Sequence, residues 1–302
     1  MSRRIGHLSI CILVALIILL GVCACSSSRA LPTLRARRIS AIAKKCQDLF
    51  TAEVNAWNAK DAEALRQIYT DDIVHIDGAP LFKGIDAVIE MAREIMAGPA
   101  QGKVGQVYIS KEECVDAWHV WGIYGFTPDH PGTEFDLLQF KGGKISSWRL
   151  FYDQHFFRSG FGKASYINND LLAQFASSWS AGITDELLRL YTAEATLEDT
   201  LFGFSISEQE ALKAYIEKFV AKSPGASWEL IYPFAEKQGP RQPGNKPLAS
   251  QGGIFAIKVK DASGNLCAIE AAVILTPDDN GKITAQQVFY NADTLIACGW
   301  AK

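Results

Sequence analysis

The chain has 302 residues, with 30 Lys and Arg against 33 Asp and Glu and a formal net charge of −3. This near balance, without any block of basic residues, argues against nucleic acid and acidic lipid as partners. About 275 residues follow the N-terminal leader described next, which is enough for two domains with their own cores.

Residues 1–25 have the pattern of a secretory signal. Arg3 and Arg4 precede an almost wholly apolar run, residues 10–22, which is too short and too abruptly ended for a membrane-spanning helix. The run ends in Val-Cys-Ala-Cys before three serines, which resembles a bacterial lipobox with Cys25 as the lipidated residue. The alternatives are an ordinary cleaved signal or an uncleaved anchor. The lipobox implies an exported protein, tethered by residues 26–37 to the bacterial membrane outside the cytoplasm.

Residues 38–157 read as helices followed by strands. Apolar residues at helical spacing predict helices over 39–59, 62–69 and 85–96, with a brief strand over 72–77 between the last two. Strand patterns follow over 104–109, 115–126, 134–140 and 145–156, and Gly142-Gly143 predicts a tight turn before the last of them. Residues 158–165 are the expected linker.

Residues 166–302 repeat this order. Helices are predicted over 171–181, 184–191 and 211–220, the last opened by a capping box of Ser207 and Glu210. A strand over 195–199 precedes that helix, and further strands follow over 228–234, 254–260, 266–275 and 283–290.

The two halves also repeat in sequence. Tyr-Thr-Asp-Asp-Ile-Val-His-Ile-Asp-Gly at residues 69–78 answers Tyr-Thr-Ala-Glu-Ala-Thr-Leu-Glu-Asp-Thr at residues 191–200, 122 residues later. Phe-Tyr-Asp at residues 151–153 answers Phe-Tyr-Asn at residues 289–291. We therefore predict a tandem duplication of a whole domain. The expected fold is α+β, with two cone-shaped domains that each pack three N-terminal helices on a strongly curved antiparallel sheet.

Three segments carry a family resemblance: Trp-Asn-Ala-x-Asp at residues 57–61, Tyr-Thr-Asp-Asp at residues 69–72, and Gly-Lys-Ile-x-x-Trp-Arg-Leu-Phe-Tyr-Asp at residues 143–153. In this order they resemble the nuclear transport factor 2-like superfamily over residues 38–300, and the first half is similar to SnoaL-like polyketide cyclases and ketosteroid isomerase. The resemblance implies a general base at Asp77, or at Asp199 in the second half, and an acidic hydrogen-bond donor at Asp136. The family's oxyanion Tyr would fall at Glu53 and Phe175, and this departure argues against steroid isomerisation.

Other polar candidates lie near these positions. His75 shares a strand face with Asp77, and the resemblance suggests His119 as a second acid or base. Apart from residues 1–25, every His lies in the first half, so we expect polar chemistry there. The resemblance places Tyr152 and Tyr290 against the ligand pocket, where we also count Trp57 and Asp199 as ligand-binding candidates. Each has a structural alternative: turn capping for the Asp residues, a satisfied core position for His119, and a helix–sheet anchor for Trp57.

Cofactors and metals are not expected. His75 and Asp77 could be two metal ligands, but no third is evident, and the cysteines match no zinc module. Outside the leader the chain has Cys46, Cys114, Cys267 and Cys298. Export would permit them to pair, although scattered cysteines in a well-cored domain are commonly free thiols.

The sequence favours a binding role. In this interpretation the two cones pack sheet to sheet as an internal pseudo-dimer and bind a small apolar ligand or a partner at the membrane surface. The alternative is an acid–base enzyme, a cyclase, isomerase or dehydratase that uses Asp77 with His75 or His119. A third possibility is a structural pseudo-dimer within an envelope assembly.

Overall fold

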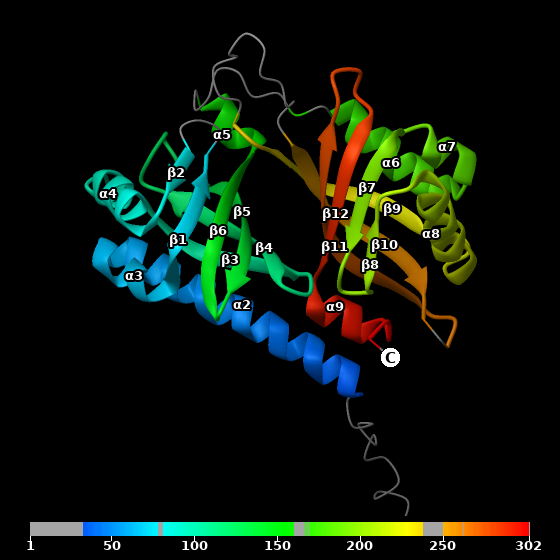
Figure 1. Ribbon diagram of the computed structural model, residues 1–302, viewed down its shortest axis with the longest axis horizontal. Coiled ribbons are helices and arrows are strands. Elements are labelled where there is room, and N and C mark those ends of the chain that lie inside the picture. The colour runs from blue at the N-terminus through cyan, green and yellow to red at the C-terminus, as the bar shows by residue number, and fades with distance from the viewer. Residues whose placement is uncertain are drawn as a thin grey trace, which may run out of the picture. The chain divides into compact units, whose positions relative to one another are not determined.

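The computed structural model describes residues 33–77, 81–159, 167, 169–237, 250–261 and 263–301. The predicted lipidation site Cys25 and most of the predicted linker lie outside these residues. The elements of the first half (Figure 1) are α2 (Leu34–Ala59), η1 (Ala62–Ala64), α3 (Leu65–Ile68), β1 (Tyr69–Ile76), β2 (Leu81–Lys83), α4 (Ile85–Met96), β3 (Gln101–Ile109), β4 (Glu113–Trp121), β5 (Gly132–Lys141), β6 (Lys144–Asp153) and α5 (Gln154–Arg158).

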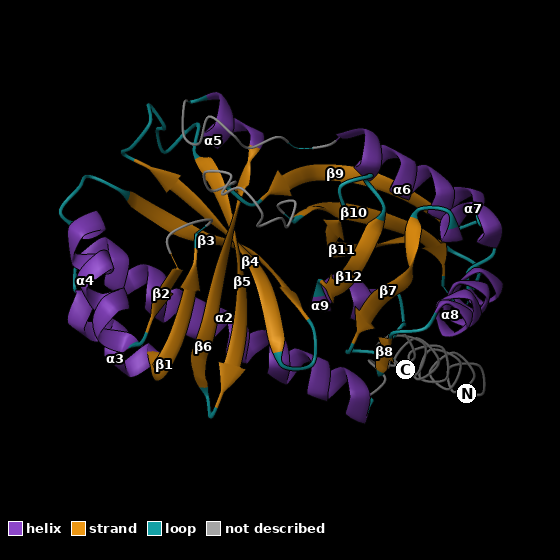
Figure 2. Cartoon of the chain, turned by 45° about the horizontal axis from the view of Figure 1, so that its top comes forward, coloured by secondary structure: helices purple, strands orange, loops and turns teal. Residues whose placement is uncertain are grey.

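The second half has the same order of elements. They are α6 (Asn169–Ala181), α7 (Thr184–Leu188), β7 (Tyr191–Asp199), β8 (Phe204–Ile206), α8 (Gln209–Lys222), β9 (Ser227–Ala235), β10 (Gln251–Lys260), β11 (Leu266–Pro277), β12 (Ile283–Tyr290) and α9 (Ala292–Ala297). Figure 2 shows the strands between two outer groups of helices, α3 with α4 and α6 with α8.

Most predicted elements are present, with several corrections. The predicted helix over 85–96 is α4, but α2 begins at Leu34, so part of the predicted tether is helical. The strand predicted to continue to residue 156 ends at Asp153, whose side chain accepts from the Phe156 amide and caps α5. The predicted capping box is wrong, because α8 begins at Gln209 and its N-cap Glu208 forms no side-chain bond. Ser207 therefore lies one residue outside the N-cap position.

The strands of the two halves are joined, which corrects the expectation of two separate sheets. Neighbouring strands pair in the order β11-β10-β9-β6-β5-β4-β3-β12, and β11 also pairs with β12, so eight strands form a closed ring. The ring closes through Tyr152–Ala235 and Asp153–Phe234 between β6 and β9, and through Ile109–Tyr290 between β3 and β12. Pairing in this way covers edge strands that would otherwise expose unsatisfied backbone groups.

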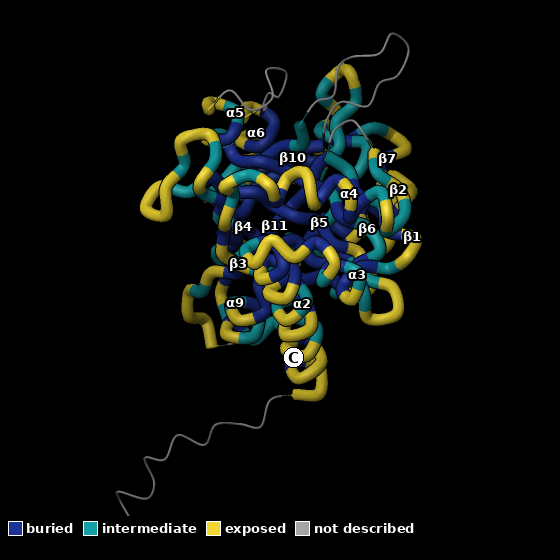
Figure 3. Tube along the Cα trace, turned by 90° about the vertical axis from the view of Figure 1, so that its left-hand side faces the viewer, coloured by how far each residue is buried: buried dark blue, intermediate teal, exposed yellow. Residues whose placement is uncertain are grey.

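Two apolar clusters follow from the alternation of the strands. One lies between helices and strands and contains buried aromatic residues of both halves, such as Trp57 and Trp179. The other lies between the two sets of sheet strands. Its members all come from the ring strands: Tyr108, Val115, Ala117, Phe135, Leu137, Phe151, Phe234, Ile254, Ala272, Ile274 and Phe289. Figure 3 shows that buried residues gather along β4, β5, β10 and β11, as expected for strands covered on both faces.

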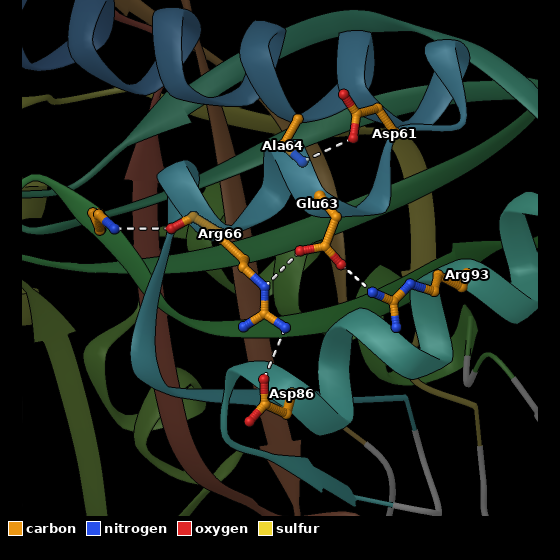
Figure 4. A network of polar contacts seen from close by, with 7 residues as sticks. Asp61, Glu63, Ala64, Arg66, Asp86 and Arg93 are labelled. Carbon is orange, nitrogen blue, oxygen red and sulfur yellow. Dashed lines mark hydrogen bonds and ion pairs between the residues drawn. The ribbon is translucent and has the colours of Figure 1, made fainter.

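A surface ion network connects α4 to the helical segments η1 and α3, which precede β1 (Figure 4). Arg66 lies 2.8 Å from Glu63 and 2.8 Å from Asp86 of α4, and Arg93 of α4 also contacts Glu63. Because these groups are exposed, the network orients α4 more than it stabilises the fold.

A disulfide links Cys267 of β11 to Cys298, which follows α9. It attaches the end of the described chain to the second-half sheet. Cys46 and Cys114 are buried free thiols in the first half. Of the four cysteines outside the leader, two therefore form a disulfide and two remain thiols.

Candidate functional site

Buried carboxyl groups line the inner face of the first-half sheet. Glu134 and Asp136 lie two residues apart on β5, so both face the helices. Glu134 is paired across the sheet with Trp118 on one side and Tyr152 on the other, and Asp136 is paired with Asp116. Glu134 is 8 % exposed, and Asp116 and Asp136 are fully buried.

Burial favours the protonated form of each of these carboxyls. Burial raises the pKa of Asp136 to about 7, although the nearby Trp148 indole and Glu134 carboxyl lower it. No partner meets either oxygen of Asp136 or of Asp116 in hydrogen-bond geometry. Burial, followed by the charge of Asp136, raises the pKa of Asp116 and of Glu134 well above the usual range. Like charges directly opposite one another on adjacent strands repel, so the neutral forms are favoured.

Glu53 extends the carboxyl set onto helix α2. It is 1 % exposed and accepts a short hydrogen bond from the Tyr69 hydroxyl. Burial and then the charge of Asp136 raise its pKa to about 8. The position at which the family resemblance implies a Tyr thus carries a carboxyl group, and the phenol reaches it from β1.

Asp77 is the accessible end of this set. Its side chain is 25 % exposed and lies 3.7 Å from the Lys237 ammonium, which the second half contributes. The Tyr152 hydroxyl donates a 3.0 Å hydrogen bond to Asp77 Oδ1. Tyr124 also interacts with this carboxylate. Burial raises the pKa of Tyr124, and the charges of Asp77 and Glu134 raise it further. Tyr152, Lys237 and Tyr124 therefore gather around Asp77 at one end of the first-half interior.

His75 is buried between aromatic rings. Its ring lies 4.4 Å from that of Trp148 and 5.8 Å from that of Phe82, and Nδ1 has no hydrogen-bond partner. Burial lowers its pKa to about 4. The aromatic surroundings therefore favour the neutral imidazole.

His119 does not join Asp77 and Asp136. On β4 the residues Asp116 and Trp118 face the helices. His119 therefore faces the other way, toward the ring strands of the second half. There its Nδ1 lies 3.3 Å from Thr133 Oγ1, and its ring lines a cavity between the two sheets. Trp57 packs on Trp118 and Trp148 at 5.9 Å each, which is the helix–sheet anchor that the sequence suggested as the alternative to ligand binding.

The second half keeps one acid of this kind. Asp199 Oδ2 accepts 2.9 Å hydrogen bonds from both Tyr215 and Tyr290, and burial raises its pKa to about 6. Tyr290 donates to Asp199 as Tyr152 does to Asp77, so the two strand-end pairs correspond.

The other carboxyls have no counterpart there. Ala271 pairs with Tyr290 as Glu134 pairs with Tyr152, which places Val273 at the position of Asp136. Gly253 pairs with Val273, so it takes the place of Asp116. Phe175 takes the place of Glu53 at the 122-residue offset. The second-half interior is aromatic, with Phe175, Trp179 and Trp228 in mutual contact.

The described residues contain no group of three His, Cys, Asp or Glu side chains arranged to bind a metal ion. Over the same residues, no helix is long and apolar enough to cross a membrane.

Comparison with known proteins gives a family match for part of the first half. Residues 50–148 match the model of the SnoaL-like domain. This part of the chain is thus similar to SnoaL-like domains, within the mixed α+β architecture described above. No curated protein is similar enough to match the chain.

Similar solved structures each cover between 35% and 40% of the chain. SalBIII, an epoxide hydrolase/cyclase-like enzyme in pyran ring formation of salinomycin, is 20% identical, with a TM-score of 0.32, covering 40% of this chain and 88% of its own. A nuclear transport factor 2-like protein of unknown function from Mesorhizobium loti is 13% identical, with a TM-score of 0.31, covering 36% and 92%. One from Cytophaga hutchinsonii is 11% identical, with a TM-score of 0.30, covering 35% and 88%.

Proposed function

We propose that the first half is an acid–base site that binds a small, mostly apolar carbonyl compound at Asp77 and exchanges a proton with it. One observation carries the proposal. Glu53, Asp116, Glu134 and Asp136 are buried in the first half, whereas apolar residues occupy the corresponding positions of the second. An unpartnered buried carboxyl destabilises a protein. The second half has the same element order without this set, which supports a chemical role for it rather than a structural one.

The groups around Asp77 fit proton removal from carbon next to a carbonyl. The Asp77 carboxylate would accept the proton, and its hydrogen bond from Tyr152 would keep it oriented. The Lys237 ammonium, 3.7 Å from Asp77, would stabilise the negative charge that develops on the substrate oxygen. The protonated carboxyls behind Tyr152 would keep the interior uncharged, so that an apolar substrate is not repelled.

Exchange of α-protons for deuterium in 2-tetralone tests this proposal. Wild-type protein in D₂O should accelerate the exchange above the buffer rate, as followed by NMR. Asp77→Asn should reduce that acceleration by at least about 100-fold, the usual contribution of a general base. Asp199→Asn is the matched control and should leave it unchanged. Exchange at the buffer rate with wild-type protein, or an equal loss in both variants, would refute the acid–base site.

Binding without chemistry is the second candidate, and the burial of the interior favours it. Asp116 and Asp136 are inaccessible to solvent and His75 is enclosed by rings, so only the Asp77 end can meet a ligand. In that case 2-naphthol, an apolar body with one hydroxyl, should bind with its hydroxyl at Asp77. Asp77→Asn should then weaken 2-naphthol binding about tenfold, the value of one hydrogen bond to a charged group, while 2-tetralone exchange stays at the buffer rate.

We also propose that the whole chain is exported, lipid-anchored at Cys25, and built from two SnoaL-like domains, 38–157 and 166–302, packed as an internal pseudo-dimer. The shared element order and the apolar cluster between the sheets support the domain assignment. The Cys267–Cys298 disulfide supports an oxidising compartment. Cys25→Ala should abolish fatty-acid labelling and release the protein from membranes, and retention of the variant would contradict the anchor.

A further inference from the structure

A cavity of about 500 Å³ lies between the first-half and the second-half strands of the ring. It is on the opposite face of β4 and β5 from the carboxyl set. Its volume is in the range of small-molecule sites. Five ring strands contribute its apolar wall, through Val104, Ala117, Phe135, Ile231 and Ile254. The rings of Phe135 and Tyr232 lie 5.7 Å apart along this wall. The cavity adjoins the apolar cluster between the ring strands. Four residues belong to both: Tyr108, Ala117, Phe135 and Ile254.

Two interruptions of strand pairing border this cavity. The register of β3 with β4 shifts between Val104 and Val107, and that of β9 with β10 shifts at Ile231. The bulged residues Gly105, Gln106 and Ile231 all line the cavity. A Cβ at Gly105 would lie 2.7 Å from His119 Nε2 and 2.9 Å from the Ala117 carbonyl oxygen. Glycine at this bulge therefore leaves the space that the His119 imidazole occupies.

A polar network supports one end of the cavity. His119 pairs across the strands with Lys103, and its Nδ1 lies 3.3 Å from Thr133 Oγ1. Behind Thr133, the buried Asp153 accepts 2.9 Å and 2.7 Å hydrogen bonds from the Thr133 amide and the Tyr232 hydroxyl. Burial and the charge of Lys103 lower the pKa of His119, so the imidazole is neutral at pH 7 and Lys103 provides the positive charge.

The other end carries the opposite charge. Tyr108 lies five residues beyond Lys103 on β3, roughly 15 Å along an extended strand. Glu270 of β11 also lines the cavity, and its charge, after burial, contributes to raising the pKa of Tyr108. The cavity thus has a cationic end, an aromatic and aliphatic middle, and an acceptor end.

We infer that this cavity is a second ligand site, distinct from the site proposed at Asp77, for a flat and mainly apolar molecule with an acidic group at one end. The acidic group contacts Lys103 and the His119 side, the body lies against Phe135, Ile231 and Tyr232, and a hydrogen-bond donor on the molecule faces Glu270. Both halves contribute to the walls, so the joining of the two sheets creates the site.

The fluorescent anion 8-anilinonaphthalene-1-sulfonate has this chemistry and serves as the probe. It should bind the full-length protein and brighten. Lys103→Gln should weaken its binding about five- to tenfold, and Ile231→Glu at least tenfold, because a carboxylate at the opening repels the sulfonate. Both side chains reach the surface, and Ile231 is 50% exposed, so neither variant should unfold the protein.

Three control variants locate the probe. Lys83→Gln makes the same charge change on β2, and Ile95→Glu changes a side chain of α4 that is 49% exposed. Asp77→Asn alters only the site proposed at Asp77. All three should bind the probe within twofold of wild type. An absence of probe binding to wild type, an equal loss in the control variants, or a loss confined to Asp77→Asn would overturn the inference.

Discussion

Replacing Asp136 with Asn should make the protein more stable at high pH relative to wild type. The pKa of Asp136 is about 7 in the folded protein, compared with 3.8 for the ordinary carboxyl. Because the folded-state pKa is raised, folding is favoured while the group is protonated. That contribution is complete below pH 3.8, declines as the pH rises, and is fully lost above pH 7. At about 1.4 kcal/mol for each pKa unit, the loss is about 4 kcal/mol.

Urea denaturation at pH 4, 6 and 8 measures this effect. The Asn amide carries a constant cost of about 1–3 kcal/mol as an unpartnered buried group, so the test is the change with pH. The free energy of unfolding of Asp136→Asn minus that of wild type should rise by about 4 kcal/mol from pH 4 to pH 8. In the control Asp72→Asn the difference should not rise, because Lys141 lowers the pKa of this exposed group. A pH-independent difference in Asp136→Asn would refute the raised pKa.

Three further predictions concern packing, the disulfide and His75. Phe234→Ala should lower the free energy of unfolding by about 3–5 kcal/mol, since Phe234 is fully buried between Phe135 and Phe151; a loss under about 1 kcal/mol would show that the inter-sheet cluster is not packed as described. Cys298→Ser should cost about 3–4 kcal/mol by opening a disulfide that spans 31 residues, and a melting temperature equal to that of wild type would contradict this. The His75 imidazole should titrate near pH 4 by NMR; a value near 6.5 would place it in solvent.

The sequence predicted the order of helices and strands because periodicity survives in long amphipathic elements, as in α4. It could not predict the ring of strands. The pairs Tyr152–Ala235 and Ile109–Tyr290 join segments far apart in the chain, and no local pattern specifies them. The short β2 and β8 were missed for a related reason, since three-residue strands carry almost no alternation.

The candidate site was predicted in part. Asp77 and Tyr152 were named from the sequence and form a hydrogen bond, as do Asp199 and Tyr290. His119, suggested from the sequence as an acid or base beside Asp77, lies on the opposite face of β4 from Asp116. Both faces of β4 are covered, and alternation gives no direction in such a strand.

Glu53, Asp116 and Glu134 were not predicted as site residues. In a helix or strand pattern, isolated acids normally indicate the solvent face. The second half has Phe175, Gly253 and Ala271 at the corresponding positions. Comparison of the two halves was the available signal, because an acid at a position that is apolar in the other half indicates a buried acid.

A pH titration of the side-chain carboxyl carbons by ¹³C NMR tests the central claim most directly, because proton exchange at Asp77 depends on the protonated carboxyls behind it. In wild-type protein the Asp136 signal should titrate near pH 7 and the Glu53 signal near pH 8, and the Asp116 and Glu134 signals well above the ordinary range of a carboxyl. Titration of all four between pH 3 and pH 5 would show ordinary, solvated acids. That result would contradict the acid–base site.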